Sequence, residues 1–521
     1  MAVDTRWYDL EDSAKFVNLE GVEFREYQFN ISQHIFDGLN TLVILPTGLG
    51  KTLIAVFAIA KIIASNRKAL FLAPTKPLSE QHFATLSAML KVDKGNVLLL
   101  TGATASKKRQ ELEKSAQVIV ATPQTVTNDL KHGFFSMKDF GIVVFDECHR
   151  AVGKYAYTYI ADECKLYGVQ TLGLTASPGS NRERIRELLK SLDTEQIEAR
   201  ISTDPDVVRY VMPKYMRIIW VDKSEAINRI AFALRPIIES SLQKLNEYGL
   251  ASARRFESIP RGRLIELGNT ISKIQARNFK FAAMFSYIRL LDAFHAYDLL
   301  ETEGIFSFLQ YVESLNAREK KSRALESFLN DKGLIAAKRL AEQELHEGRE
   351  HPKVAELVKL LKEEKGRKMI VFAQYRSTIK MIVGKLQEQG LSARAFVGKK
   401  EGVTQEQQKK TIADFRNGEF EILVSSSIGE EGLDIPTVDM VVFYEPIPSE
   451  IRNIQRRGRT GRLYAGEIVV LAARETRDVA YLFVSRNREV RMQRIVSELK
   501  SELAGKAARK QGEKQKRLDV V

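Results

Sequence analysis

The sequence has very little cysteine and no long apolar run. Two cysteines, Cys148 and Cys164, occur among 521 residues, and they do not form a CxxC pair. A disulfide framework is therefore excluded, a reducing compartment fits, and a metal would be bound through oxygen ligands rather than in a zinc site. No apolar stretch approaches the roughly 18 residues of a membrane span. The start of the chain also lacks a basic segment followed by an apolar one, so we expect a protein that is neither secreted nor membrane-bound.

Length and charge narrow the class further. At roughly 100 to 200 residues per domain, the chain predicts about three domains. Hydrophobic residues make up 44% of it, enough for a sizeable core, which excludes a mainly disordered protein. Lys and Arg number 80 against 66 Asp and Glu, a net charge of +14 that favours a polyanionic partner such as nucleic acid. An ordinary solvated surface is the alternative, because 28% charged residues is a normal fraction.

Two regions of alternating strands and helices flank a helical one. Short β-rich runs such as TLVIL, ALFLA and GIVVF alternate with amphipathic stretches, a pattern typical of parallel sheets buried on both faces. The middle of the chain has helical periodicity, with one plausible strand at 216–222. We predict an α/β protein with a first lobe (1–204), a helical inserted domain (205–350), a second lobe (351–475), and a basic C-terminal helix with a linker-like tail (476–521).

The stretch LPTGLGKT, residues 45–52, lies where a strand ends and a helix begins. A glycine-containing turn there aims backbone N–H groups and a helix N-terminus at phosphates. Lys51 is then expected to reach the β- and γ-phosphates and Thr52 to bind Mg²⁺. Leu45 occupies a position where the strict pattern has Gly or Ala, and an ordinary strand-to-helix turn is the simpler alternative.

A second stretch, VVFDECH, places two acidic residues at the end of a buried strand. A carboxylate beside a phosphate loop can hold a metal, usually through water, and its neighbour can activate the attacking water. We assign Asp146 to Mg²⁺ and Glu147 to the catalytic base. His149 is either a plain loop residue or a group that senses the nucleotide. Alone, the two acidic residues would indicate a solvated loop, but together with the phosphate loop they indicate a nucleotide site.

A third stretch, IQRRGRTGR at residues 454–462, lies in the second lobe. Arg459 and Arg462 flank one tight turn and are expected to reach across a cleft to the transferring phosphoryl group. The glycines at 458 and 461 favour close approach over a merely solvated basic run.

Together with several further motifs in fixed order, these stretches resemble the superfamily 2 helicases and translocases with two RecA-like lobes. The resemblance covers residues 20–475 and implies an ATP-dependent helicase that uses ATP and Mg²⁺. FREYQ implies an adenine-reading pair, Arg25 and Gln28, beside the phosphate cradle formed by Thr47, Gly48, Leu49 and Gly50. SSSIGEEGLDIP places Gly432 and Asp434 near the nucleotide, and Gln455 matches the position that orients the γ-phosphate or water. Other motifs imply nucleic-acid contacts at Pro74, Thr75, Lys76, Thr101, Gly102, Thr122, Pro123, Gln374, Arg376, Ser425 and Ser426.

Within that superfamily, DECH, LTASPGS and FYEPIPSEIRNIQRRGRTGR resemble the Hef and Fanconi-anaemia M group of fork-processing DNA translocases. The resemblance implies branched or forked DNA as partner, a role in DNA repair at replication forks, and a cytoplasmic, nucleoid-associated or nuclear location. No nuclease motif of the Hef type appears, so we expect a helicase-only form or a fragment. Two alternatives stay open: an RNA-duplex-dependent ATPase of the RIG-I and Dicer type, and an ATP-gated scaffold that binds junctions.

The inserted domain carries a concentrated positive charge. Residues 251–280 hold seven basic residues against two acidic ones. Basic side chains on helices suit the phosphates of a duplex, which supply affinity without sequence information. We expect Arg254, Arg255, Arg261 and Arg263 to contact duplex DNA at a branch, as the thumb-like insert of the resembled family does. A solvated helix face is the alternative.

Overall fold

A computed structural model describes most of the chain. The described residues are 5–46, 48–102, 104–201, 204–210, 215–252, 256–259, 261–397, 404–426, 438–446 and 467–518. Within these ranges, no helix combines the length and the apolar character that crossing a bilayer requires.

Lobe one is built on a parallel sheet of seven strands. From one edge of the sheet to the other, the strand order is β3-β4-β2-β5-β6-β1-β7. Six strands match the β-rich runs of the sequence and confirm that prediction. The seventh, β7, was not predicted, because QIEA is short and carries the buried Glu198. The strands are β1 (Thr41–Ile44), β2 (Lys68–Leu72), β3 (Val97–Leu100), β4 (Val118–Ala121), β5 (Phe140–Asp146), β6 (Gln170–Thr175) and β7 (Gln196–Ala199).

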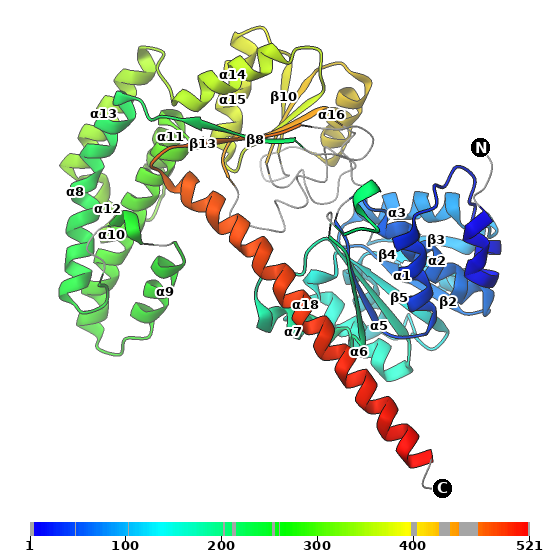
Figure 1. Ribbon diagram of the computed structural model, residues 1–521. Coiled ribbons are helices and arrows are strands. Elements are labelled where there is room, and N and C mark those ends of the chain that lie inside the picture. Colours follow the sequence, from blue (N-terminus) through cyan, green and yellow to red (C-terminus); the bar gives the residue numbers. More distant parts are fainter. Residues whose placement is uncertain are drawn as a thin grey trace.

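Helices cover both faces of this sheet, as Figure 1 shows at the blue and cyan end of the chain. One apolar cluster gathers around Phe57 and Phe71, and the other around Phe145 and Tyr157. Both faces of the sheet are therefore buried, which explains why the strand sequences are continuous apolar runs. The helices are α1 (Glu26–Phe36), α2 (Lys51–Ala64), α3 (Lys76–Met89), α4 (Ser106–Ser115), α5 (Pro123–Lys131), α6 (Ala156–Tyr167) and α7 (Arg182–Ser191), after the 3₁₀ segment η1 (Thr5–Phe16).

Lobe two contains a six-stranded parallel sheet and corrects one predicted boundary. Its order is β10-β11-β9-β12-β13-β8. The edge strand β8 (Tyr215–Val221) pairs with β13 along its whole length, although it precedes the insert and was assigned to it. Sequence periodicity identifies a strand but not its partner. The other strands are β9 (Met369–Phe372), β10 (Ala393–Phe396), β11 (Ile422–Ser425), β12 (Met440–Phe443) and β13 (Glu467–Ala473), with helices α14 (Pro352–Glu363), α15 (Arg376–Glu388) and α16 (Gln405–Asn417).

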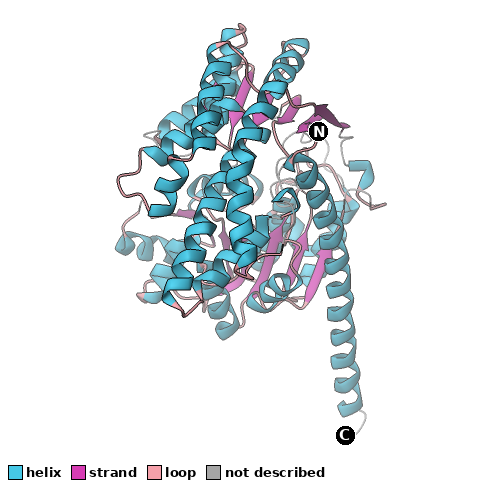
Figure 2. Cartoon of the chain, turned by 90° about the vertical axis from the view of Figure 1, so that its left-hand side faces the viewer, coloured by secondary structure: helices cyan, strands magenta, loops and turns pink. Residues whose placement is uncertain are grey.

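The insert is helical, as expected, and begins at Glu225 rather than at 205. Its long helices α8 and α10 pack together around the buried side chains of Phe294, Phe308 and Phe328. Figure 2 shows these helices from the side that faces away from lobe one. The elements are α8 (Glu225–Glu247), α9 (Arg261–Ser272), α10 (Arg277–Thr302), α11 (Ile305–Asn316), α12 (Arg323–Leu329) and α13 (Lys332–His346).

A single helix, α18 (Arg477–Leu518), follows lobe two. It leaves the end of β13, crosses to lobe one and passes beyond it, drawn in orange and red in Figure 1. The C-terminal segment predicted as a linker-like tail is thus helical through Leu518. The apolar side chains that secure the helix lie between 492 and 499 and bury against lobe one, a contact that basic composition alone does not reveal.

Candidate functional site

The predicted site residues of lobe one lie along one edge of its sheet. All seven strands are parallel, so the loops that follow them emerge at the same edge. The phosphate loop follows β1, Asp146 ends β5, and Thr175 ends β6. The nucleic-acid motifs follow β2, β3 and β4, on the other half of the same edge. Two sets of loops therefore adjoin each other without overlapping.

The phosphate loop turns on two glycines with left-handed backbone. Gly48 has φ +86° and Gly50 has φ +71°, a region that side chains rarely adopt. A Cβ atom on Gly50 would also lie 2.3 Å from Nε2 of Gln28. Lys51 begins α2 and donates from Nζ to the carbonyl oxygens of Leu45 (2.8 Å) and Pro46 (3.4 Å). The loop thus has the turn and the lysine that a phosphate cradle requires; Thr47 lies outside the described residues.

Gln28 braces this loop from α1. Its Nε2 donates to the carbonyl oxygens of Leu49 (3.0 Å) and Gly50 (3.4 Å), and Tyr27 Oη donates to Leu49 O at 2.7 Å. Gln28 Oε1 is buried without a hydrogen-bond partner among the described residues. Arg25 contacts Glu23 and Tyr27. The amide therefore holds the loop with its nitrogen, while its buried oxygen makes no hydrogen bond to the described residues.

Asp146 is buried beside a histidine that the sequence analysis missed. His82 Nε2 lies 2.9 Å from Asp146 Oδ2, and both side chains are about nine-tenths buried. Burial alone would raise the pKa of Asp146, but His82 and Lys51 outweigh it and lower the pKa below its ordinary value. The carboxylate is therefore held charged, as a metal ligand must be. His82 directly follows Gln81 in the LAPTKPLSEQ stretch, but nothing in the sequence pairs it with Asp146.

Glu147 has an unusual backbone and a polar neighbour. Its φ of +49° is left-handed, which costs free energy in a residue with a side chain. Its Oε2 atom lies 3.3 Å from His149 Nδ1 and has no hydrogen-bond partner among the described residues. His149 Nδ1 lies 3.2 Å from Thr175 Oγ1. Oε2 of Glu147 therefore lies within ion-pair distance of His149 and makes no hydrogen bond to the described residues, which leaves it as a spare acceptor beside a polar neighbour.

Predicted nucleic-acid contacts gather at helix N-termini. Thr75 is the N-cap of α3, Thr122 of α5, and Tyr375, beside Gln374, of α15. Backbone N–H groups and the helix dipole at such termini favour phosphate oxygens. Pro74 is buried, whereas Lys76 and Gly102 are exposed. Thr101, Pro123, Arg376, Ser425 and Ser426 are also described, and all five lie at or just beyond strand ends or in the first turn of a helix.

Several predicted residues cannot be placed. The structure does not describe Arg254, Arg255, Gly432, Asp434, Gln455, Arg459 and Arg462. The backbone of Arg261 is described and begins α9. For all of these residues the assigned roles remain predictions.

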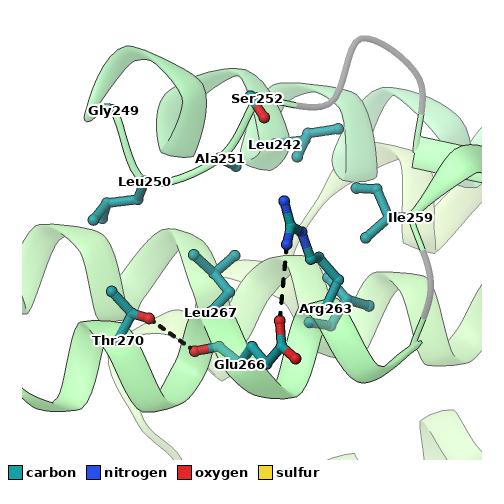
Figure 3. A pocket seen from close by; sticks show the side chains of 11 residues that line it. Leu242, Gly249, Leu250, Ala251, Ser252, Ile259, Arg263, Glu266, Leu267 and Thr270 are labelled. Carbon is teal, nitrogen blue, oxygen red and sulfur yellow. Dashed lines mark hydrogen bonds and ion pairs between the residues drawn. The ribbon is translucent and has the colours of Figure 1, made fainter.

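The basic face of the insert is exposed where it is described. The side chain of Arg263 is 73% exposed and lies 4.0 Å from Glu266, while Lys273 and Arg277 are also exposed. Arg263 borders a cavity of about 410 Å³ between the end of α8 and α9, together with Leu242, Leu250 and Leu267, as Figure 3 shows. The side chain of Phe281, in the first turns of α10, is 70% exposed. Charged and aromatic groups are thus both available to a ligand.

Comparisons with known proteins agree with this geometry. A family model described as DEAD/DEAH box helicase matches residues 25–185, and one described as helicase conserved C-terminal domain matches residues 352–464. The crystal structure of the Pyrococcus furiosus Hef helicase domain is 38% identical, with a TM-score of 0.70. This chain covers all of that structure, which in turn covers 90% of this chain. The chain belongs to the superfamily 2 helicases of the Hef type.

Curated relatives of this helicase are longer proteins. A Methanocaldococcus jannaschii protein named as an ATP-dependent RNA helicase is 35% identical over 92% of this chain and 61% of its own length. The ATP-dependent DNA helicase mph1 of Neurospora crassa is 33% identical over 86% and 41%, respectively. The ATP-dependent DNA helicase fml1 of Schizosaccharomyces pombe is 31% identical over 90% and 59%. The helicase chain thus spans about two fifths to three fifths of these relatives.

Proposed function

We propose that this helicase uses ATP hydrolysis to move along DNA at forks and junctions and to unwind or branch-migrate them. The observation that carries the proposal is the single sheet edge of lobe one. The loops that we propose to bind phosphates follow strands on one half of that edge, and the motifs that we propose to contact nucleic acid follow strands on the other half. A change in the nucleotide can therefore alter the grip on a strand through neighbouring loops.

The ATP site has a consistent division of labour. Lys51 and the loop amides from Gly48 to Thr52 would hold the phosphates, and Gln28 Oε1 is an acceptor suited to the adenine amino group, with Arg25 supporting it. Thr52 and Asp146 would hold Mg²⁺, which neutralises phosphate charge when bound. Glu147, with its spare buried acceptor atom, would take a proton from the attacking water.

Lobe two would complete the site. Arg459 and Arg462 are proposed to reach the transferring phosphoryl group when the lobes close, with Gln455 orienting the γ-phosphate or water and with Gly432 and Asp434 near the nucleotide. Because these arginines would stabilise the charge on the phosphoryl group only when the two lobes close, ATP turnover would depend on lobe closure. Alternate gripping by the N-termini of α3, α5 and α15 would then advance the protein along one strand.

The insert is proposed as a duplex clamp. Its exposed basic side chains between 263 and 280 suit duplex phosphates, and the exposed ring of Phe281 is available for stacking at a fork. Phosphate contacts fix position without reading sequence, which agrees with a protein that recognises branches by shape.

RNA duplexes are the second candidate substrate. The Methanocaldococcus jannaschii relative and the Arabidopsis thaliana relative FANCM carry RNA helicase in their names. ATPase rates should be compared across single-stranded, duplex, forked and four-way DNA, with double-stranded RNA as comparator. The proposal requires forked or four-way DNA to stimulate most strongly, and RNA stimulation above that of DNA would overturn it. Strand displacement with and without ATP would separate a motor from a junction-binding scaffold.

A further inference from the structure

Helix α18 is firmly attached to lobe two at its start. Asp478, in the first turn, accepts hydrogen bonds at Oδ2 from Lys353 Nζ and from the Ala473 backbone N–H, both at 2.9 Å. The side chains of Lys353 and Asp478 are fully buried. Breaking one partner of such a buried pair is strongly destabilising, so the start of α18 moves with lobe two.

The middle of the same helix is seated on lobe one. Met492, Ile495, Val496 and Leu499 are at most 6% exposed and belong to the apolar cluster of lobe one that includes side chains of α7. Figure 1 shows the helix passing α7 on its way from lobe two. The continuous helix therefore joins the two lobes at two fixed points.

Ion pairs flank the apolar seat. Arg182 Nη1 lies 2.8 Å from Glu498 and Arg186 Nη2 lies 3.2 Å from Glu502, while Lys500 Nζ lies 3.6 Å from Glu198 on β7. Most of these groups are partly exposed, so each pair contributes little to stability. Their value is positional, because they select one register of the helix on α7 and β7.

One polar contact links the seated helix to the nucleotide side of lobe one. Ser177 Oγ donates to Met492 Sδ at 2.8 Å, and both residues are buried. The Ser177 backbone N–H donates to Thr175 Oγ1 at 3.1 Å. Thr175 Oγ1 lies 3.2 Å from His149 Nδ1, which lies 3.3 Å from Glu147 Oε2. Two hydrogen bonds, the contact between Thr175 and His149, and an ion-pair contact from His149 to Glu147 Oε2 thus join α18 to the carboxylate proposed as the base.

We propose that Met492 is a positioning residue for ATP hydrolysis: it holds the Ser177 turn, and through Thr175 and His149 it fixes the carboxylate of Glu147. The left-handed backbone of Glu147 makes such support necessary, because a strained residue keeps its conformation only when its surroundings enforce it. Since α18 starts in lobe two, the arrangement of the lobes acts on the base by this route. The inference rests on the proposed role of Glu147.

The test compares two matched substitutions in the full chain. Met492→Leu removes the sulfur acceptor and keeps the buried volume. Leu499→Met makes the reverse exchange about two turns further along α18. Both substitutions conserve volume and should cost the fold little stability. Met492→Leu should lower DNA-stimulated kcat about fivefold, the loss typical of one hydrogen bond. The KM for ATP should not change, and Leu499→Met should match the unmodified protein. Equal turnover in the two variants at equal melting temperature would overturn the proposal.

A double-mutant cycle tests the route itself. Ser177→Ala removes the donor of the same hydrogen bond, so the combination with Met492→Leu should lose no more than Ser177→Ala alone. Multiplied losses would reject the contact as the route. Glu147→Gln tests the role of Glu147 separately from its coupling to Met492. Substantial residual turnover in Glu147→Gln would reject the base assignment. An inactive Glu147→Gln together with normal turnover in Met492→Leu would reject only the coupling.

Discussion

His82 Nε2 lies 2.9 Å from Asp146 Oδ2 in the interior of lobe one, although 64 residues separate the two along the chain. The contact keeps a buried carboxylate charged at the end of β5, next to the phosphate loop. Such a partner also orients the carboxylate, which matters because a metal ligand must present its oxygen in one direction.

Replacing His82 by Ala should weaken Mg²⁺ binding. The pKa of Asp146 then rises, because burial is no longer outweighed by the histidine, and more of the carboxylate is protonated on the acid side. We expect the Mg²⁺ concentration for half-maximal ATPase to increase about tenfold, and the acid limb of the rate profile to move to higher pH. His132→Ala, an exposed histidine of the same lobe, is the control and should leave both unchanged.

Glu147→Gln should bind ATP and hydrolyse it about 100-fold more slowly or worse, because an amide cannot accept the proton from water. Nucleotide binding is measured by fluorescence titration and turnover by phosphate release. Glu183→Gln makes the same change on the exposed first turn of α7 and should behave like the unmodified protein. Near-normal turnover of Glu147→Gln would assign the base elsewhere.

Arg459→Ala should lose turnover with little loss of nucleotide binding. The arginine is proposed to act on charge that develops during transfer, so its contribution belongs to kcat. Lys51→Ala provides the contrast, since the lysine is proposed to contact phosphates in the bound state, so its loss should weaken nucleotide binding as well. A parallel loss of binding in Arg459→Ala would contradict the proposed role.

Reversing Arg261 and Arg263 to Glu should weaken fork binding at moderate salt. Two lost phosphate contacts should also reduce the slope of log affinity against log salt by up to about 2. Affinity is measured by fluorescence anisotropy at several salt concentrations. Reversing the exposed Lys320 and the half-buried Lys321, which lie between α11 and α12, makes the same charge change elsewhere on the insert. Equal affinity in the two double variants would reject the clamp.

Glu303→Gln should alter the pH dependence of stability. Burial raises the pKa of Glu303 to about 7, with Lys353 opposing that effect and with Asp478 and Asp298 adding to it. The folded protein then binds more protons than the unfolded one at mildly acid pH, so this group's contribution to stability is lost as pH rises through 7. We expect about 2 kcal/mol of decline between pH 5.5 and 8.

The decline in stability should be smaller by this amount in Glu303→Gln, because the amide does not titrate and still accepts from Thr378 Oγ1. Urea unfolding at the two pH values measures it, and Glu313→Gln, exposed on α11, is the control. The same slope in Glu303→Gln would attribute the pH dependence to other groups.

The sequence by itself determined the local elements and the order of the motifs. Runs such as TLVIL and GIVVF are apolar because their strands are buried on both faces, so most strands of the two lobes could be predicted from these runs, whereas β7 could not. The phosphate loop could also be predicted, because Gly48 and Gly50 lie between a strand and a helix, and both adopt the left-handed backbone that favours glycine. These features depend on neighbouring residues in the chain.

Only the tertiary structure decided which distant segments meet. In the folded chain, β8 pairs with β13 of lobe two and His82 contacts Asp146. Met492 contacts Ser177, which lies 315 residues earlier in the chain. Hydrogen bonds and buried contacts of this kind join side chains whose sequence separation carries no periodic signal. Burial makes them strong, because an unpaired polar group inside the protein is costly, and the same burial hides them from composition and pattern.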